Sequence, residues 1–411
     1  MLIKNAIYAQ SGGVTAVINA SACGVIQTAR LHPDLINKVY AAENGIIGAL
    51  EERLIDTSLE SDDDIARLMH TPSGAFGSCR YKLKNDGAEY DRLIDVFKAH
   101  NIGYFFYNGG GDSQDTAYKI ATISKERGYP VTCIGIPKTV DNDLPFTDTC
   151  PGFGSVAKYV AISTLEAGFD VASMAASSTK VFILEVMGRH AGWIAAAAGL
   201  ASQEESQPPH IILFPEITFD SIRFLAKVKN SVDLYGYCVI VVSEGIRNEE
   251  GNFLSDAGLR DAFGHAQLGG VAPVIAQLIK NEFGYKYHWA VADYLQRAAR
   301  HIASLVDVEQ AFALGKAAVE LAITGHNAIM PIIQREQDSP YRWSISHVSL
   351  QIVANQEKAM PREYIAKDGM GITTACRTYL EPLIQGEAYP PYQNGLPDYV
   401  RLKNVLVPKK L

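Results

Sequence analysis

The chain has 411 residues with a formal net charge of −8, and 47% of the residues are hydrophobic. This length predicts two or three domains, and the composition is that of a folded globular protein rather than a disordered one. The acidic balance argues against a general nucleic-acid binder, which needs a basic surface. No apolar run reaches transmembrane length, so we expect no membrane partner. Six cysteines without a CxxC pair are typical of free thiols in a reducing cytoplasm.

Short apolar segments alternate with amphipathic ones along the chain. Continuous apolar strands between helices are typical of parallel sheets that are covered on both faces. Ligands of open α/β sheets bind where such strands end. The Pro- and Tyr-rich tail after Pro382 predicts an extended segment that wraps over the surface. In chain order we expect a strand at 7–9, a helix at 15–28, a strand at 103–107, a helix at 115–125, a strand at 131–136, a helix from 155, strands at 182–186, 210–214 and 239–242, a helix at 308–324 and a strand at 328–333.

Two glycine-rich segments each lie between a predicted strand and a predicted helix. The first is SGG at 11–13, and the second is a run of glycines at 109–111 followed by Asp112 and Ser113. Glycines at such places let the backbone approach a phosphate, and the helix N-terminus offers unpaired N–H groups. Each segment also has a purely structural interpretation, as a tight turn in the first case and as a helix N-cap at Asp112 or Ser113 in the second.

A third segment, residues 137–143, follows the buried strand predicted at 131–136. It holds two aspartates, a lysine and a threonine within seven residues. Phosphoryl transfer to an alcohol needs a carboxylate that accepts the hydroxyl proton and cations that neutralise the phosphoryl oxygens. A polar surface turn is the alternative, but ligands commonly bind at the end of a parallel strand.

Three further segments each carry an arginine in or beside a loop, at 77–80, 187–189 and 294–297. The planar guanidinium group is suited to binding phosphate oxygens. Taken alone, each of these arginines is more often a structural or surface residue.

Together these segments resemble the phosphofructokinase family in order and spacing. The resemblance covers about residues 5–335, and the TxDND and MGR motifs are highly specific. It implies two Rossmann-like α/β domains with mainly parallel sheets covered by helices, and an active site in the cleft between them. The matching motifs are SGG at 11–13, GSCR at 77–80, GGGDS at 109–113, PKTVDND at 137–143, EVMGR at 185–189, SEG at 243–245 and YLQR at 294–297.

Two positions bear on the phosphoryl donor. ATP-dependent members look like GGDGS and PGTIDND, whereas this chain has Asp112 in place of a small residue and Lys138 in place of a glycine. The aspartate would take the space and charge of a further phosphate, and the lysine would supply a cation to a short donor. The resemblance therefore implies reversible, Mg²⁺-dependent phosphoryl transfer from pyrophosphate to the C1 hydroxyl of fructose 6-phosphate, in glycolysis and gluconeogenesis. An ATP-dependent 6-phosphofructokinase is the alternative.

The implied cofactor is Mg²⁺. Gly111 stands where ATP-dependent members carry an acidic residue near the metal. The metal contact must therefore come from Asp112, from Asp141 through water, or mostly from pyrophosphate itself, since Mg²⁺ commonly binds through substrate phosphates.

The resemblance also implies a role for each matching residue. Asp141 is the general base that takes the C1 hydroxyl proton, while Lys138 and Arg80 neutralise the transferred group and Asp112 completes the catalytic set. The glycines at 12, 13, 110 and 111 present backbone to pyrophosphate. The binding residues are Gly12, Gly13, Gly110, Gly111 and Ser113 for pyrophosphate, and Thr139, Asp143, Lys180, Met187, Gly188, Arg189, Glu244, Tyr294 and Arg297 for the sugar phosphate.

Lys180 stands where family members offer an arginine across a subunit interface, and Lys286 or His288 is a candidate for a second such contact. Shared sites imply an oligomer, either a homodimer or a homotetramer. The implied domains are a pyrophosphate-binding domain at 1–150 and about 298–345, a sugar-phosphate-binding domain at 151–297, and a C-terminal extension at 346–411.

Two other classes of protein fit the sequence less well. A dinucleotide-binding oxidoreductase predicts a GxGxxG motif, which residues 11–15 do not provide. A non-catalytic subunit of the same fold predicts the loss of Asp141 or Arg189, and both are present.

Overall fold

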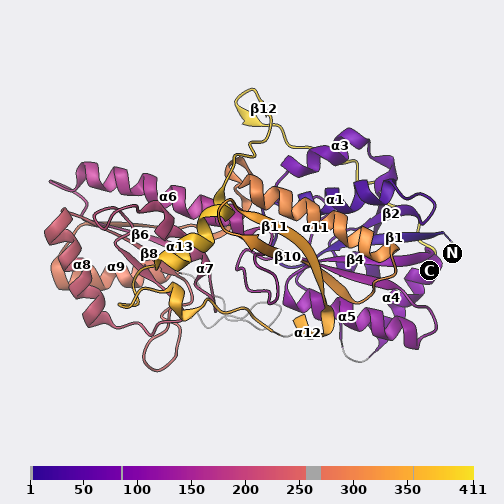
Figure 1. The fold of residues 1–411 in the computed structure, drawn as a ribbon, viewed down its shortest axis with the longest axis horizontal. Coiled ribbons are helices and arrows are strands. Elements are labelled where there is room, and N and C mark those ends of the chain that lie inside the picture. The colour runs from indigo at the N-terminus through magenta and orange to yellow at the C-terminus, as the bar shows by residue number, and fades with distance from the viewer. Residues whose placement is uncertain (1–2, 85–86, 256–269, 355) are drawn as a thin grey trace. The chain divides into compact units, whose positions relative to one another are not determined.

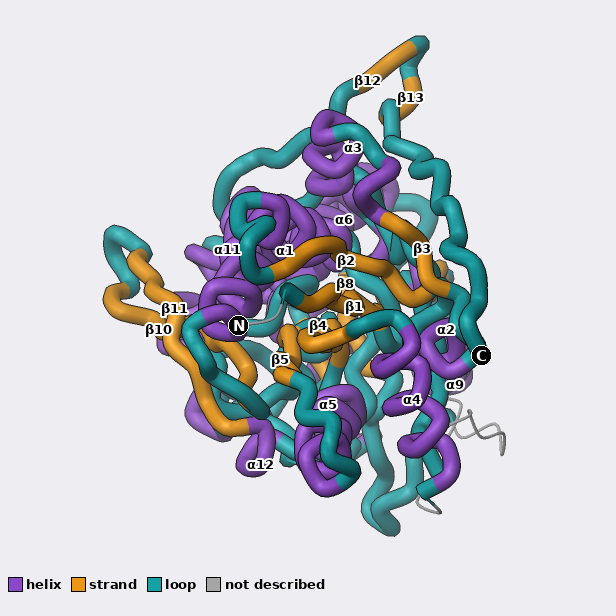
Figure 2. The backbone as a smooth tube through the Cα atoms, turned by 90° about the vertical axis from the view of Figure 1, so that its right-hand side faces the viewer, coloured by secondary structure: helices purple, strands orange, loops and turns teal. Residues whose placement is uncertain are grey.

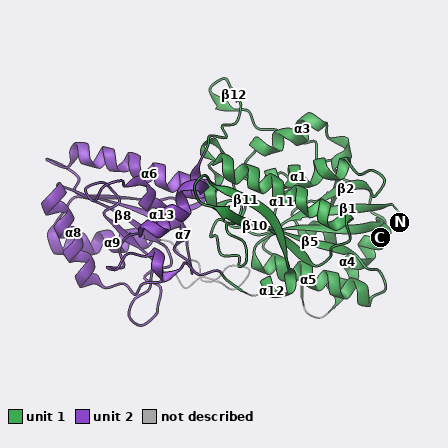
Figure 3. Cartoon of the chain, viewed as in Figure 1, with its two compact units in different colours: residues 1–154, 298–357, 386–411 green, residues 155–297, 358–385 purple. Residues whose placement is uncertain are grey.

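The computed structural model describes residues 3–84, 87–255, 270–354 and 356–411. It divides into two compact units, which Figure 3 shows in different colours. The first unit comprises residues 1–154, 298–357 and 386–411, and the second comprises residues 155–297 and 358–385. Both contain mainly parallel sheets surrounded by helices, which confirms the predicted α/β class.

A seven-stranded sheet forms the centre of the first unit (Figure 1). Its order is β11-β10-β5-β4-β1-β2-β3, and the inner strands are parallel, whereas β11 and β3 run antiparallel to their neighbours. The strands are β1 (Lys4–Gln10), β2 (Ile36–Ala42), β3 (Leu54–Asp56), β4 (Ile102–Gly109), β5 (Thr132–Pro137), β10 (Ile329–Gln337) and β11 (Arg342–Ser349). The helices are α1 (Ile18–Arg30), α2 (Ile46–Leu50), α3 (Asp62–Arg67), α4 (Ala88–Ala99), α5 (Gly111–Glu126), α11 (Leu305–Ile323) and α12 (Leu350–Val353).

Helices cover both faces of this sheet because its central strands are apolar on both sides. Successive side chains of a strand point to opposite faces. In β4, Phe106 packs in one cluster with residues of α1 and α11, and Phe105 packs in another with residues of α4 and α5. Burial on both faces is what the continuous apolar segment at 103–107 predicts.

The second unit contains a four-stranded parallel sheet in the order β7-β8-β6-β9. Residues 358–385 belong to this unit, and the N–H of Ile212 donates a hydrogen bond of 3.0 Å to the carbonyl oxygen of Met370 beside the sheet edge. The strands are β6 (Val181–Val186), β7 (Ile211–Leu213), β8 (Cys238–Ser243) and β9 (Tyr287–Val291), and the helices are α6 (Phe153–Met174), α7 (Trp193–Ala197), α8 (Ser221–Tyr235), α9 (Val271–Phe283), α10 (Asp293–Ala298) and α13 (Thr374–Leu380).

The predicted C-terminal extension at 346–411 is not a separate unit. Residues 346–357 and 386–411 belong to the first unit, and residues 358–385 belong to the second. The sequence does not predict this division, because it depends on pairing with distant strands, as between β10 and β11.

The chain ends in an extended segment, residues 398–411, which we call the C-terminal strap. It runs from the β12–β13 hairpin (Tyr392–Gln393 and Leu396–Pro397) past β3, as Figure 2 shows. The N–H of Asp56 donates to the carbonyl oxygen of Val405 at 2.9 Å, and the N–H of Val407 donates to that of Leu54 at 2.8 Å. The strap therefore covers the β3 edge of the sheet, which would otherwise offer unpaired backbone groups.

A buried carboxylate anchors the end of the strap. The backbone N–H groups of Lys410 and Leu411 donate to Glu52 at 2.7 and 3.2 Å. Burial by itself raises the pKa of the Glu52 carboxyl, but hydrogen bonds from Lys410, His100, Arg92 and Leu411 outweigh it and lower the pKa to about 2. The strap is thus part of the folded first unit rather than a loose tail.

None of the cysteines forms a disulfide, and all six lie in the part of the chain that the structure describes. Within that part, no helix is long and apolar enough to cross a membrane.

Candidate functional site

Three loops of the first unit begin at the same edge of its sheet. They follow β1, β4 and β5, which are neighbouring parallel strands paired along their lengths. Because the carboxyl ends of parallel strands share one edge, the segments at 11–13, 110–113 and 138–143 start side by side. The structure thus brings together the glycines, the lysine and the aspartates that the motifs predict.

Lys138 is a buried cation among these loops. It is 4% exposed, and its Nζ donates a hydrogen bond of 2.7 Å to the carbonyl oxygen of Gly13. Its backbone N–H donates to the carbonyl oxygen of Gly109 at 3.2 Å. Gly12 has a φ of +74°, which favours glycine, and a Cβ there would lie 3.4 Å from Nζ of Lys138. The ammonium group therefore lies against the first glycine loop, and the backbone of Lys138 is bonded to the start of the second.

The segment that carries Arg80 is joined to the first glycine loop by its backbone. The N–H of Gly12 donates to the carbonyl oxygen of Cys79 at 2.9 Å, and the hydroxyl of Ser78 donates to that of Gly12 at 2.8 Å. Ser11 and Cys79 also form an isolated parallel bridge. Arg80 is exposed and follows directly in the chain, so the backbone places a cation beside the first loop.

Asp112 lies in the first turn of α5 rather than at its N-cap. The N-cap is Gly110, with no side-chain cap, so the N-cap interpretation of Asp112 or Ser113 is wrong. The carboxylate of Asp112 is 3.0 Å from Nζ of Lys82, and both side chains are partly exposed. A carboxylate in this turn is favoured by the helix dipole. No motif marks Lys82, and the sequence therefore does not predict this partner.

Gly109 and Gly111 of the second loop differ in whether packing requires a glycine. A Cβ at Gly109 would lie 2.1 Å from Oγ of the buried Ser113, so only glycine fits there. A Cβ at Gly111 would meet no atom of the described residues within 4 Å. Packing therefore explains Gly109, whereas the space beside Gly111 is open.

The loop after β5 is a tight turn that presents two half-buried aspartates. The N–H of Asp141 donates to Oγ1 of Thr139 at 3.1 Å. Asn142 is fully buried in the left-handed region, with a φ of 55°, and its Oδ1 accepts from the N–H of Cys150 at 3.0 Å. Asparagine tolerates this conformation better than most residues. Asn142 thus fixes the turn that carries Asp141 and Asp143, a role that its place in the motif does not reveal.

In the second unit, most of the predicted sugar-phosphate residues gather at the carboxyl ends of β6 and β8. Residues 187–189 follow β6, Glu244 follows β8, and Val186 is paired with Ser243 in parallel register. The hydroxyl of Ser243 donates to the carbonyl oxygen of Gly188 at 2.5 Å, and the N–H of Glu244 donates to that of Val186 at 2.9 Å. These bonds hold the two loops together.

Arg189 and Glu244 are the charged members of this cluster. Burial raises the pKa of the Glu244 carboxyl, and the positive charge of Arg189 partly opposes this effect. Nε of Arg189 is buried and has no hydrogen-bond partner among the described residues. A buried donor without a partner is costly, so this nitrogen can donate to an acceptor that the described residues do not supply.

Helix α10 carries the last predicted group. The guanidinium of Arg297 lies 3.8 Å from the centre of the Tyr294 ring, in a cation–π contact. Gln296 is buried, and its Oε1 accepts from the N–H of Met187 at 3.4 Å. These contacts connect α10 to the loop after β6 and orient Arg297.

Lys180 does not join this cluster within one chain. It precedes β6, whereas residues 187–189 follow that strand, a separation of about 20 Å along the strand direction. Its backbone N–H donates to the carbonyl oxygen of Lys286 at 2.9 Å, and Nζ of Lys286 donates to Oγ of Ser178 at 3.0 Å. His288 is an exposed residue of the edge strand β9. Lys180 and Lys286 therefore form a separate basic pair at the amino end of β6.

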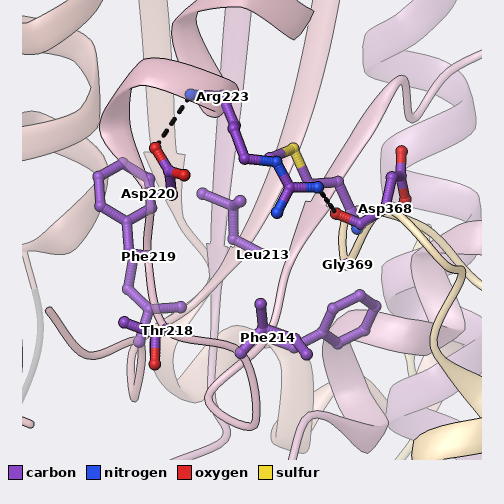
Figure 4. A pocket seen from close by; sticks show the side chains of 11 residues that line it. Leu213, Phe214, Thr218, Phe219, Asp220, Arg223, Asp368 and Gly369 are labelled. Atoms are coloured by element: carbon purple, nitrogen blue, oxygen red, sulfur yellow. Dashed lines mark hydrogen bonds between the residues drawn. The ribbon is translucent and has the colours of Figure 1, made fainter. Parts of the chain in front are cut away.

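A hollow in the second unit lies near the end of β7 (Figure 4). Its charged groups already have partners, because Arg223 donates to the carbonyl oxygen of Asp368 at 3.1 Å and Asp220 accepts from the backbone N–H of Arg223 at 3.1 Å. Asp368 also forms an ion pair with Lys227. The hollow lies beside the start of α8, and none of the predicted site residues lines it.

Glycine loops, a buried lysine and two aspartates of one turn at the ends of parallel strands define an α/β protein that handles phosphate groups. The family model for phosphofructokinase matches residues 5–322. A pyrophosphate–fructose 6-phosphate 1-phosphotransferase from Methylococcus capsulatus is 67% identical over 100% of this chain and 99% of its own, and the protein of that name from Halomonas elongata is 65% identical over the same shares. The crystal structure of a pyrophosphate-dependent phosphofructokinase from Marinobacter aquaeolei is 66% identical and covers 100% of this chain and 98% of its own, with a TM-score of 0.93. The chain belongs to the phosphofructokinase family.

Proposed function

We propose that the chain catalyses reversible phosphoryl transfer from pyrophosphate to the C1 hydroxyl of fructose 6-phosphate, giving fructose 1,6-bisphosphate and phosphate. The observation that carries the proposal is the buried Lys138, which lies in the same loop as Asp141 and whose Nζ is 2.7 Å from the Gly13 carbonyl oxygen. The relatives at 65–67% identity, which carry the name of this activity over their full length, support it.

The chemistry assigns a separate task to each group of the first unit. Asp141 accepts the C1 hydroxyl proton as that oxygen attacks a phosphorus of pyrophosphate. The bond to the bridging oxygen breaks, and phosphate leaves with the electron pair. Lys138 and Arg80 neutralise negative charge on the transferred group, while the N–H groups of the two glycine loops orient pyrophosphate. Thr139 holds Asp141 in place through its hydroxyl.

Mg²⁺ is proposed as the cofactor, bound mainly through the phosphate oxygens. Asp112 and Asp141 are the carboxylates that we assign to its neighbourhood, and Asp112 already pairs with Lys82. Such a set fits an ion that enters with pyrophosphate, because Mg²⁺ commonly keeps several waters and few protein ligands. When bound, the ion supplies positive charge to the phosphoryl oxygens.

Donor choice is assigned to Asp112 and Lys138. The carboxylate of Asp112 lies in the first turn of α5, where we expect a longer donor to extend. We expect Asp112→Gly to let ATP bind weakly, because the change removes a like charge and a side chain from that turn. ATP and tripolyphosphate should then become competitive inhibitors against pyrophosphate. Inhibition constants of ATP and tripolyphosphate, measured for the unmodified chain and for Asp112→Gly, check this expectation. The control is Asp95→Gly, a change at another exposed aspartate. Unchanged inhibition by both longer phosphates would contradict the assignment.

The second unit is proposed to bind the sugar phosphate through Arg189, Glu244 and Arg297. We expect Arg297→Ala to raise KM for fructose 6-phosphate about 10- to 150-fold and to leave KM for pyrophosphate nearly unchanged, because a charge-assisted phosphate contact is lost. Steady-state kinetics with each substrate varied in turn measures the effect. Arg247→Ala is a matched control, since Arg247 also stacks on an aromatic ring, Phe253, at 3.8 Å. Equal changes in both KM values would make Arg297 a structural residue.

A homodimer is proposed as the working form. Phe169 of α6 is 71% exposed and Trp289 of the edge strand β9 is 45% exposed, and large apolar side chains of this kind are typical of surfaces that associate. Lys180 and Lys286 lie at the amino end of β6, away from the cluster of their own chain, which fits a contribution to a neighbouring subunit. We expect light scattering after size-exclusion chromatography to give twice the chain mass of 44.7 kDa. A monomeric, fully active enzyme would contradict a shared site, whereas four times that mass would indicate the tetramer.

The reverse reaction tests the proposed function. The purified chain with fructose 1,6-bisphosphate, phosphate and Mg²⁺ should form pyrophosphate and fructose 6-phosphate, and removal of Mg²⁺ by a chelator should stop the reaction. Asp141→Asn is the negative control. Absence of pyrophosphate formation under conditions where the chain is folded would overturn the proposal. A cytoplasmic location is proposed as well, from the metabolic substrates and from six cysteines that form no disulfide.

A further inference from the structure

Residues 71–80, which we call the Arg80 loop, are held by a buried asparagine of α1. Asn19 is fully buried, and its Nδ2 donates to the carbonyl oxygen of Thr71 at 2.9 Å. Its Oδ1 accepts from the N–H of Ala75 at 2.9 Å. One side chain thus ties both ends of a short turn, and the same loop continues into the backbone contacts between Cys79 and Gly12.

The C-terminal strap holds the same turn at the same two residues. The N–H of Val400 donates to Oγ1 of Thr71 at 3.2 Å. Nδ2 of Asn404 donates to the carbonyl oxygen of Ala75 at 3.2 Å, and its backbone N–H donates to Glu60 at 3.0 Å. Thr71 and Ala75 are therefore each bonded to Asn19 and to the strap.

The strap is itself fixed at points outside the Arg80 loop. Arg67 and Asp398 form an ion pair of 2.7 Å, and Lys403 donates to the carbonyl oxygen of Leu59 at 2.9 Å. Beyond Asn404 the strap pairs with β3 and ends at Glu52 (Figure 2). A segment anchored on both sides of Asn404 can restrain the loop, because its own position does not depend on the loop alone.

We propose that the C-terminal strap is a positioning element of the phosphoryl-transfer site, which acts through the Arg80 loop. Asn404 and Val400 fix Thr71 and Ala75, and the loop then carries Ser78 and Cys79 to the first glycine loop and Arg80 to the phosphate. The inference rests on the proposed role of Arg80. A displacement of about 1 Å in a group that aligns the reacting atoms is enough to lower turnover substantially.

Asn404→Gly is the most direct test. Asn404 has a φ of 50°, a conformation that glycine adopts readily, so the change removes the amide while keeping the backbone path. We expect kcat/KM for pyrophosphate to fall about fivefold, the effect of losing one hydrogen bond, with KM for fructose 6-phosphate unchanged. Thr71→Val, which removes the strap contact from the loop side, should act in the same direction. The matched control is Lys410→Ala, which removes an exposed side-chain contact of the strap, the bond of 2.9 Å from Nζ to the carbonyl oxygen of Ala99, and should leave the kinetics unchanged.

A double-mutant cycle with Arg80→Ala separates this inference from the proposed function. If the strap acts through Arg80, Asn404→Gly should have no further effect on kcat/KM for pyrophosphate in the Arg80→Ala background. Additive losses would overturn the inference, as would normal kinetics of both Asn404→Gly and Thr71→Val while Arg80→Ala is impaired. If Arg80→Ala itself retains normal turnover, the assigned role of Arg80 is wrong and the strap inference falls with it.

Discussion

Asp141→Ala should lower kcat by about 10²- to 10⁴-fold while KM for either substrate changes little, because a general base acts mainly in the transition state. The structure supports this expectation by placing Asp141 on a turn that is fixed on both sides. Oγ1 of Thr139 accepts a hydrogen bond of 3.1 Å from the N–H of Asp141. The next residue, Asn142, is fully buried, and its Oδ1 accepts from the N–H of Cys150 at 3.0 Å. Steady-state assays of fructose 1,6-bisphosphate formation measure the decrease in kcat.

Two further variants are the comparisons for Asp141→Ala. Asp95→Ala removes an exposed carboxylate elsewhere in the first unit and should leave kcat unchanged. Asn142→Gly keeps a residue that tolerates a φ of 55° but removes the bond to Cys150, so it should lower kcat less than Asp141→Ala does. An Asp141→Ala enzyme with kcat near that of the unmodified chain would remove Asp141 from the role of base.

Lys138→Met should lower kcat with pyrophosphate by about 30- to 1,000-fold, which corresponds to about 2–4 kcal/mol of transition-state stabilisation. Methionine keeps much of the apolar stem of the lysine and removes the ammonium group, with its charge and its hydrogen bond to Gly13. Because Lys138 is almost fully buried, its charge acts where water does not screen it well. The effect should therefore be larger on kcat than on KM for pyrophosphate.

The control for this variant is another lysine of the same unit. Lys119→Met on α5 breaks an ion pair of 2.7 Å with Asp115 and should leave turnover near normal. Thermal unfolding of both variants shows whether loss of the bond from Lys138 to the Gly13 carbonyl oxygen weakens the fold. Normal pyrophosphate turnover by a folded Lys138→Met enzyme would contradict the donor assignment and leave the family assignment intact.

The sequence predicts the continuously apolar strands of both sheets and misses the more polar or shorter strands β2, β3, β9 and β11. β4 and β8 are continuous apolar segments buried on both faces, and this pattern is distinctive. β11, with the sequence RWSISHVS, is half-exposed, and its place depends on antiparallel pairing with β10. The helix predicted at 115–125 also begins too late in the chain, because glycine has low helix propensity and yet Gly111 begins α5.

The candidate site shows the same division between local and distant information. Motifs predict Gly12, Lys138 and Asp141, because each lies in a short segment whose composition carries the chemistry. The contacts of Lys82 and of the C-terminal strap are not predicted, since they join segments far apart in the chain. Asn404 and Ala75, for example, are separated by 329 positions. Such partners become visible only when the fold brings them together.

The central claim is that this member of the phosphofructokinase family uses pyrophosphate as its phosphoryl donor. The most direct measurement is kcat/KM of the unmodified chain with fructose 6-phosphate and Mg²⁺, with pyrophosphate or ATP as the donor in the same preparation. The buried Lys138 and the carboxylate of Asp112 predict rapid formation of fructose 1,6-bisphosphate with pyrophosphate and at least about 1,000-fold lower kcat/KM with ATP. Equal or faster turnover with ATP would contradict the claim.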